Sequence, residues 1–330
     1  MKKKLVLIDG HAILHRAYHA LPKTLTNRHG QMINAAYGFT RMILRVIEDL
    51  KPEYLAVAFD RPEPTFRHKE FMGYQVQRPK MDSELKDQIQ IVKEVLKAFS
   101  IPALEKIGFE ADDVIGTLAS QAQARNLESQ ISNFKITAKK SKLKKRKRTK
   151  IETIIVTGDR DIFQLIDKST VVYAPIRGFS QAEIFGRQKV KKNLGVWPKQ
   201  IVDYKALVGD SSDNYPGVPG IGPKTAVELL RSFKSLEKIY RNLGKVRGSV
   251  RKKLEVGKES ALLSQKLARI VTDVPVKLNL KKCRLDYDLE KVLELFGQLG
   301  FRSLVKKLKR EPGEPHKIRR KQPQQKRLFL

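Results

Sequence analysis

The chain has 330 residues and carries 67 lysines and arginines against 35 acidic residues, a formal net charge of +32. Its 41% hydrophobic residues argue against wholesale disorder, and its charge favours a polyanionic partner, nucleic acid before an acidic membrane surface. A single cysteine, Cys283, excludes an internal disulfide and suits a reducing compartment. The apolar run near the N-terminus stops after four residues, too short for a signal peptide or membrane span. We therefore expect a soluble, cytoplasmic protein that associates with the nucleoid.

Residues 1–180 alternate between short apolar runs and amphipathic stretches, which is typical of an α/β domain. Strands are predicted at 5–8, 55–59, 154–156 and 171–173, and helices at 39–50, 85–99 and from 112 onward. The strands are short and rich in β-branched residues, as in a sheet that is buried on both faces. We therefore predict a doubly wound sheet of parallel strands.

The remaining segments differ in composition from this domain. A basic insertion is expected at 130–151, where nine of the twelve residues from Lys139 to Lys150 are Lys or Arg and resist packing. This disordered loop is either merely solvated or grips phosphates without sequence preference. Residues 181–305 lack convincing strands and are predicted to be helical, for example at 202–207, 225–233 and 289–296. Residues 306–330 are predicted to form a basic flexible tail.

Nine carboxylates stand where predicted strands end or helices begin. Because the carboxyl ends of strands in an open α/β sheet border one crevice, these side chains should converge. Carboxylates packed together raise each other's pKa values, and divalent cations that prefer hard oxygen ligands, Mg²⁺ or Mn²⁺, relieve the repulsion. The pattern therefore predicts a two-metal phosphodiesterase. The nine residues are Asp9, Asp60, Glu110, Asp112, Asp113, Asp159, Asp161, Asp210 and Asp213.

A glycine-rich hairpin at 217–226 opens a predicted helix. Gly217, Gly220 and Gly222 allow close approach of the backbone to a ligand, and the helix N-terminus with Lys224 and Thr225 favours phosphate. The spacing matches neither a Walker loop nor a dinucleotide fingerprint. A glycine turn alone is usually structural, but the acidic residues directly upstream and the basic chain favour a clamp on the DNA backbone.

Six motifs, in order, resemble the 5′-nuclease domain of bacterial DNA polymerase I, a member of the flap endonuclease family. The resemblance runs from about residue 4 to 305 and implies a Rossmann-like (PIN-like) parallel-sheet nuclease core with a helical arch at 61–82. It further implies an all-α domain of the helix-hairpin-helix type, and a free-standing, monomeric form without a polymerase module. The motifs lie at 6–10, 59–60, 65–68, 110–113, 157–161 and 209–226.

The resemblance also implies the reaction and its cofactors. The substrate would be DNA or RNA–DNA near a 5′ flap, nick or gap, cut to leave a 5′-phosphate. All nine carboxylates match metal-binding positions of the family, with two or more Mg²⁺ or Mn²⁺ ions expected there and K⁺ at the glycine hairpin. The positions expected to serve catalysis are Asp9, Asp60, Asp112, Asp113, Asp159 and Asp161.

Further DNA contacts are expected in the arch. Arg67, Arg78 and Lys80 can meet phosphates, and Tyr74 can stack on bases. A solvated surface without a role is the alternative for the two arginines.

Two positions near the first motif and one in the arch complete these expectations. Tyr18, beside Arg16, stands where the family has an aromatic residue near the active site. Packing of Tyr18 in the core is the equal alternative. Where the family commonly has a lysine that helps to hold the scissile phosphate, this chain has Gln75. This departure predicts a lower turnover rather than a different reaction.

The C-terminal residues have the form of peptides that bind the bacterial sliding clamp. Leu328 and Phe329 would dock in an apolar pocket and Gln325 at its rim, tethered by the basic tail. An accidental frayed terminus is the equal alternative.

The leading hypothesis is a structure-specific 5′-3′ nuclease that removes RNA primers and flaps in replication and repair. A ribonuclease of the PIN-like fold is an alternative enzyme, and the glycine hairpin and the arch argue against it. A non-catalytic binder of branched DNA, or a clamp-associated scaffold, is an alternative of another class. The complete set of nine carboxylates argues against that class, whereas Gln75 is compatible with it.

Overall fold

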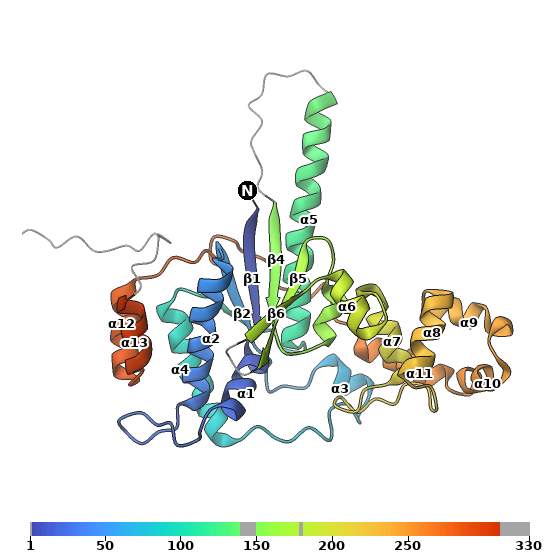
Figure 1. Cartoon of the computed structure of the whole chain (residues 1–330), viewed down its shortest axis with the longest axis horizontal. Coiled ribbons are helices and arrows are strands. Elements are labelled where there is room, and N and C mark those ends of the chain that lie inside the picture. Colours follow the sequence, from blue (N-terminus) through green and yellow to red (C-terminus); the bar gives the residue numbers. More distant parts are fainter. Residues whose placement is uncertain (1, 139–149, 178–180, 311–330) are drawn as a thin grey trace, which may run out of the picture.

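The computed structural model describes residues 2–138, 150–177 and 181–310, and its centre is one six-stranded sheet (Figure 1). The strand order is β3-β2-β1-β4-β5-β6, and all neighbours are parallel except β5 and β6. The strands are β1 (Lys3–Asp9), β2 (Tyr54–Ala58), β3 (Ala103–Leu104), β4 (Ile151–Val156), β5 (Thr170–Arg177) and β6 (Gln181–Phe185).

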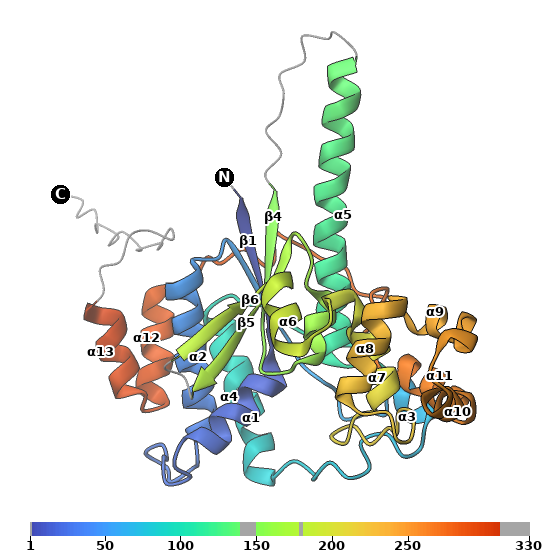
Figure 2. The ribbon, with the colours of Figure 1, turned by 45° about the vertical axis from the view of Figure 1, so that its right-hand side comes forward.

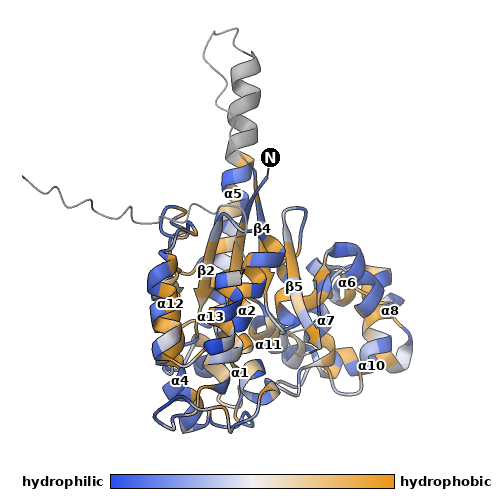
Figure 3. Cartoon of the chain, turned by 60° about the vertical axis from the view of Figure 1, so that its left-hand side comes forward, coloured by the Kyte–Doolittle hydropathy of each residue, from blue (hydrophilic) through white to orange (hydrophobic). Residues whose placement is uncertain are grey.

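Both faces of the central strands are covered, which explains why their sequences are continuously apolar. Leu5 and Leu7 of β1 enter a hydrophobic cluster shared with α5, while Val6 and Ile8 enter a second cluster with α1, α2 and α4. In Figure 3 the ribbons of the central strands are largely orange, the colour of hydrophobic residues. These helices are α1 (Gly10–Ala20), α2 (Asn34–Leu50), α4 (Ser83–Ala98) and α5 (Ala111–Ala138), and the short α3 (Phe66–Glu70) precedes α4.

Helices after the sheet lie on two opposite sides of it (Figure 2). One group carries the glycine hairpin between α7 and α8. The second group, α12 (Leu289–Gln298) and α13 (Arg302–Arg310), returns to the α/β core, where Phe296 packs against Phe99 of the α4 region. The first group comprises α6 (Arg187–Leu194), η2 (Pro198–Gln200), α7 (Ile201–Val208), α8 (Pro223–Phe233), α9 (Leu236–Arg241), η3 (Leu243–Lys245), α10 (Gly248–Val256) and α11 (Lys258–Ala268). The short helix η1 (Asp161–Leu165) lies between β4 and β5.

The predicted strands and helices are present. Three segments outside the arch differ from expectation. β6 extends the sheet beyond residue 180, because its backbone pairs with the edge of β5 although its side chains alternate poorly. Helix α5 continues through 130–138, so that part of the expected disordered insertion is helical, and residues 139–149 lie outside the described residues. Helix α13 includes 306–310, because its apolar face packs with α12 on the core.

The segment expected to form a helical arch, 61–82, contains one short helix. Past α3 its described backbone forms turns that lie against the loop before α8, where the Asn214 side chain donates to the Gly73 carbonyl (2.7 Å).

Among the residues that the structure describes, none of the helices combines the length and the apolar character of a membrane span.

Candidate metal and nucleic-acid site

The first predicted carboxylates are held at the carboxyl edge of the sheet by backbone and side-chain donors. Asp9 ends β1 and accepts hydrogen bonds from the Ala12 N–H (3.0 Å) and the Thr157 hydroxyl (2.8 Å). Asp60, two residues past β2, accepts from the Ala111 N–H at the start of α5 (2.7 Å). Because α5 starts there, its first turn brings Asp112 to the same edge.

Several carboxyls at this edge are difficult to ionise in the folded protein. Burial and the charge of Asp60 raise the pKa of Asp9 to about 7. Loss of surrounding water, followed by the charges of Asp9 and Asp159, raises the pKa of Asp112 well above its usual range. Raised values of this kind concentrate at functional sites, and they fit an edge built to receive positive charge.

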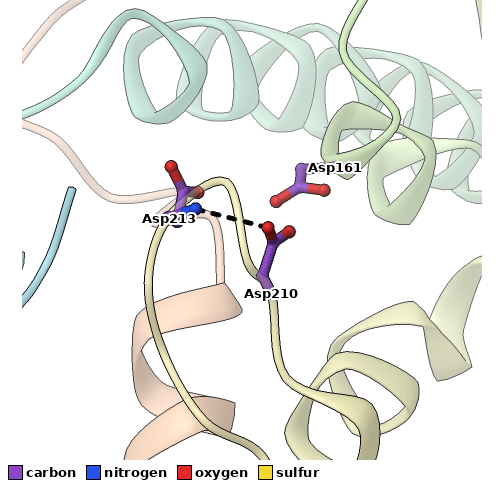
Figure 4. Close-up of side chains that lie close together, drawn as sticks. All are labelled: Asp161, Asp210 and Asp213. Atoms are coloured by element: carbon purple, nitrogen blue, oxygen red, sulfur yellow. Dashed lines mark hydrogen bonds between the residues drawn. The ribbon is translucent and has the colours of Figure 1, made fainter. Parts of the chain in front are cut away.

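Three further carboxylates, from η1 and from the loop between α7 and α8, form a cluster (Figure 4). Asp161, Asp210 and Asp213 each offer an oxygen within 4.8 Å of the others, the one such group of three among the described residues. Burial raises the pKa of Asp161 to about 7 and also raises that of Asp213. The loop wraps around Asp210, which accepts from the Ser212 N–H (2.8 Å) and the Asp213 N–H (3.3 Å).

Lys205 also lies at this cluster, although it was not among the site residues predicted from the sequence. Its ammonium contacts both Asp161 and Asp210, and these contacts outweigh its burial and raise its pKa. Burial acts to raise the pKa of Asp210, but the hydrogen bonds from Lys205 and Ser212 hold it below the usual range. The available signal was a lysine near the end of a predicted helix, directly before an acidic loop. The lysine supplies a positive charge that the protein itself holds inside the cluster.

Asp113 and Arg67 are partners in the interior, which corrects both predicted roles. Asp113 is 0% exposed, and two donors point at each of its oxygens. Arg67 Nη1 (2.7 Å) and the Glu110 N–H (3.1 Å) reach Oδ2, while Arg67 Nη2 (2.8 Å) and the Val271 N–H (2.8 Å) reach Oδ1. A carboxylate has about four acceptor positions, so none is left for a metal. Arg67, 2% exposed, cannot meet a phosphate in this conformation.

Other predicted DNA contacts are also inside the protein. Tyr18 is buried and donates to Asp82 (2.6 Å), and Tyr74 is buried and donates to Glu110 (3.3 Å), so neither ring can stack on a base here. Gly217 is buried with a φ of +65°, and a Cβ at this position would lie 2.2 Å from the Gly209 nitrogen. Gly217 therefore closes the loop and does not face a ligand.

The remaining predicted contacts lie at the surface. Arg78 and Lys80 are exposed, as are Gly220, Gly222 and Lys224 before and in the first turn of α8. Thr225 is half-buried beside them. Arg16 is half-buried and donates to the Ile176 carbonyl (2.9 Å). Gln325, Leu328 and Phe329 lie outside the described residues.

Gln75 joins the arch segment to the acidic cluster. Its backbone N–H donates to the Asp213 carbonyl (3.0 Å), and its side-chain amide donates to Asp213 Oδ1 (2.9 Å). Arg78 approaches the same carboxylate oxygen at 3.4 Å. The residue that replaces the family's lysine is therefore a direct neighbour of a candidate metal ligand.

The two carboxylate oxygens of Glu110 show whether a cation fits the acidic edge of the sheet. Its Oε2 contacts Arg67 Nη1 (3.1 Å), but its Oε1 is buried and has no hydrogen-bond partner among the described residues. Burial raises the pKa of Glu110 to about 7, and the charges of Asp113, Asp60 and Asp213 add to the rise. A buried carboxylate oxygen without a donor, beside other carboxylates, fits a hard divalent cation.

Comparisons with known sequences match both parts of the chain. The family model "5′-3′ exonuclease, N-terminal resolvase-like domain" matches residues 4–133, and "5′-3′ exonuclease, C-terminal SAM fold" matches residues 196–290. A 5′-3′ exonuclease of Aquifex aeolicus is 37% identical, over 93% of this chain and 95% of that protein. The DNA polymerase I of Caldicellulosiruptor bescii is 43% identical over 92% of this chain but only 33% of its own length. The chain thus spans about a third of such polymerase relatives.

Solved structures with the same architecture include two nucleases bound to DNA. The phage T5 flap endonuclease, in a complex with DNA and metal ions, has a TM-score of 0.60 at 17% identity and covers 93% of this chain and 96% of its own. The catalytic core of Rad2 with a DNA substrate has a TM-score of 0.54 at 17% identity, covering 93% and 92%. At these identities the likeness establishes the fold, while the sequence matches establish the lineage. This chain belongs to the 5′-3′ exonuclease family.

Proposed function

We propose that this protein hydrolyses phosphodiester bonds at 5′ flaps, nicks or RNA-primer ends of DNA and leaves 5′-phosphate products. The observation that carries the proposal is the acidic edge itself. Asp9, Asp60 and Asp112 meet at the strand ends, and the Glu110 oxygen without a donor lies among these carboxylates and the Asp161–Asp210–Asp213 cluster. Hydrolases that cut phosphodiesters with two metal ions need such a set of oxygen ligands.

The protein's own groups set the geometry of this edge. Bound Mg²⁺ or Mn²⁺ supplies the Lewis acidity for hydrolysis. Asp9 keeps its orientation through Ala12 and Thr157, and Asp60 through the first turn of α5. Arg67 holds one oxygen of Glu110, and the other oxygen is left buried without a donor. Such fixed carboxylates need little rearrangement when substrate arrives.

DNA would lie across exposed basic residues on both sides of the acidic cluster. Arg78 and Lys80 of the arch segment, and Lys224 at the start of α8, offer phosphate contacts. The exposed turn at Gly220 and Gly222 lets a backbone phosphate approach the helix N-terminus, and K⁺ is proposed at the same turn. The proposal treats the protein as a monomer, and a clamp contact through its last residues is a separate proposal.

The test is cleavage of a 5′-labelled double-flap DNA in Mg²⁺. Wild type is compared with Asp112→Asn and with Asp87→Asn, which changes an exposed aspartate on α4 as a matched control. We expect a product that maps near the flap junction, that is absent without metal and in Asp112→Asn, and that is retained in Asp87→Asn. Tight binding without cleavage in Mg²⁺ or Mn²⁺ would refute the proposal and indicate a structural DNA-binding role.

A further inference from the structure

Tyr215 carries an unsatisfied hydroxyl inside the protein. Only two buried side-chain polar atoms among the described residues have no hydrogen-bond partner, the Tyr215 hydroxyl and Glu110 Oε1. Tyr215 is 3% exposed, so bulk solvent does not reach its ring. A buried polar group without a partner is destabilising, and native proteins keep few of them. The hydroxyl therefore requires an explanation that the mechanism above does not give.

The position of the tyrosine ring is fixed from several sides. The Tyr215 backbone exchanges two hydrogen bonds with Asp210, at 2.9 and 3.0 Å, so the residue is tied to the acidic loop. Its ring packs with Tyr74, Leu267 and Ala268 in a small apolar cluster. The arch segment, the acidic loop and α11 thus meet around one ring, and the ring cannot swing its hydroxyl outward without breaking this packing.

The hydroxyl lies within electrostatic range of the whole acidic cluster. Burial raises the pKa of Tyr215, and the charges of Asp161, Asp210 and Asp213 raise it further. A phenol carries its proton at neutral pH in any case, so the hydroxyl has an O–H to donate. Neighbouring carboxylate oxygens already serve other donors: Asp210 Oδ1 accepts from Ser212, and Asp213 Oδ1 accepts from Gln75.

We propose that the Tyr215 hydroxyl is a positioning donor for the occupant of the Asp161–Asp210–Asp213 cluster. The occupant's chemistry is an oxygen held by a divalent cation, from either a water molecule or a DNA phosphate. The inference rests on the proposed function, because it takes the cation and the phosphate from there. The hydroxyl donates to this oxygen, and a bond to an anionic phosphate oxygen is stronger than one to a neutral acceptor. Tyr215 orients the ligand and is not itself a metal ligand.

Tyr215→Phe tests the inference because stability and binding should respond in opposite ways. No hydrogen bond is lost in the metal-free protein, so its Tm should stay equal or rise. The affinity for Mn²⁺ or for flap DNA should fall about 3- to 10-fold, as expected for one lost hydrogen bond. Two arms identify the oxygen: Mn²⁺ titration without DNA reports water, and flap-DNA binding in Ca²⁺ reports phosphate. Loss in either arm supports the inference.

Two controls sharpen the comparison. Tyr240→Phe removes a hydroxyl that already donates to the Leu254 carbonyl (3.2 Å), so it should lower Tm and leave both affinities unchanged. In an Asp213→Asn background, which damages the cluster, Tyr215→Phe should add no further loss of Mn²⁺ affinity. Unchanged affinity in both arms overturns the inference, whatever happens to Tm.

These readouts do not depend on turnover. A wild type whose Mn²⁺ affinity falls in Tyr215→Phe, but which never cuts flap DNA, would refute the proposed function and leave this inference standing. A wild type that cuts flap DNA while Tyr215→Phe binds normally in both arms would refute this inference alone.

Discussion

Replacing Arg67 by methionine should destabilise the protein by about 3–5 kcal/mol, because it leaves Asp113 charged, buried and without its partner. The guanidinium contributes two hydrogen bonds to Asp113, at 2.7 and 2.8 Å. It also donates to the carbonyls of Leu267 (2.9 Å) and Arg269 (2.8 Å) at the C-terminal end of α11. Methionine keeps much of the aliphatic volume, so the loss would report the charge and the hydrogen bonds more than a cavity.

A double-mutant cycle separates the pair from its surroundings. Arg67→Met combined with Asp113→Leu removes both charges, so the double variant should be less destabilised than the sum of the single variants. The free energy of unfolding is measured by urea denaturation with two probes, circular dichroism and the fluorescence of Trp197, the only tryptophan. Coincident transitions justify two-state free energies.

The opposing hypothesis is that Arg67 contacts a DNA phosphate, and Arg78→Met is its matched control. Arg78 is exposed, so its loss should change the free energy of unfolding by under about 0.5 kcal/mol. The same change should lower the affinity for flap DNA and reduce the slope of log K against log salt concentration by about one. An Arg67→Met protein of nearly wild-type stability with a reduced salt slope would contradict our reasoning.

Three further predictions concern pH, the glycine hairpin and the arch. Without divalent cations, the free energy of unfolding should fall as pH rises from about 4 through about 7, because folding raises the pKa values of Asp9, Glu110 and Asp161 from 3.8, 4.5 and 3.8 to about 7. The folded state binds more protons in that window, and Mg²⁺ should reduce the fall in thermal melts; a flat profile in metal-free buffer would contradict this. Gly217→Ala should cost roughly 2 kcal/mol or more in urea unfolding because its Cβ has no room, whereas Gly222→Ala meets nothing within 4 Å and should weaken only DNA binding. Gln75→Lys should raise the single-turnover cleavage rate up to roughly tenfold by returning a cation beside the scissile phosphate, and an unchanged rate would exclude a deficit at this position.

The strands and their acidic ends could be predicted from the sequence because both signals are local. A short apolar run followed by aspartate, as at Asp9 and Asp60, encodes a buried strand and its polar carboxyl end together. Helices such as α2 and α4 were predictable because their apolar positions repeat with the helical period. The edge strand β6 lacks such a pattern, and only its pairing with β5 identifies it.

The partners of the site residues could not be predicted, because they depend on tertiary placement. Arg67 and Asp113 are 46 positions apart, and nothing in either motif states that one neutralises the other. The resemblance placed Arg67 in an arch that faces phosphates, whereas α3 turns this arginine inward. Tyr74 was assigned to base stacking for the same reason, and packing with Leu267 buries it.

Arg67 and Lys205, two of the cations at the acidic edge, differ in how they can respond to a ligand. Arg67 is held bidentately on a carboxylate and by two carbonyls, so it acts as a permanent counter-charge that fixes Glu110 and the start of α5. Lys205 has a flexible stem and a single ammonium, which contacts Asp161 and Asp210. A divalent cation that took the same oxygens would compete with this ammonium. The free energy of metal binding is therefore the difference between the interactions that the cluster makes with the metal ion and those that it makes with the ammonium. The site thus separates a fixed charge, which builds the edge, from a displaceable one, which balances it.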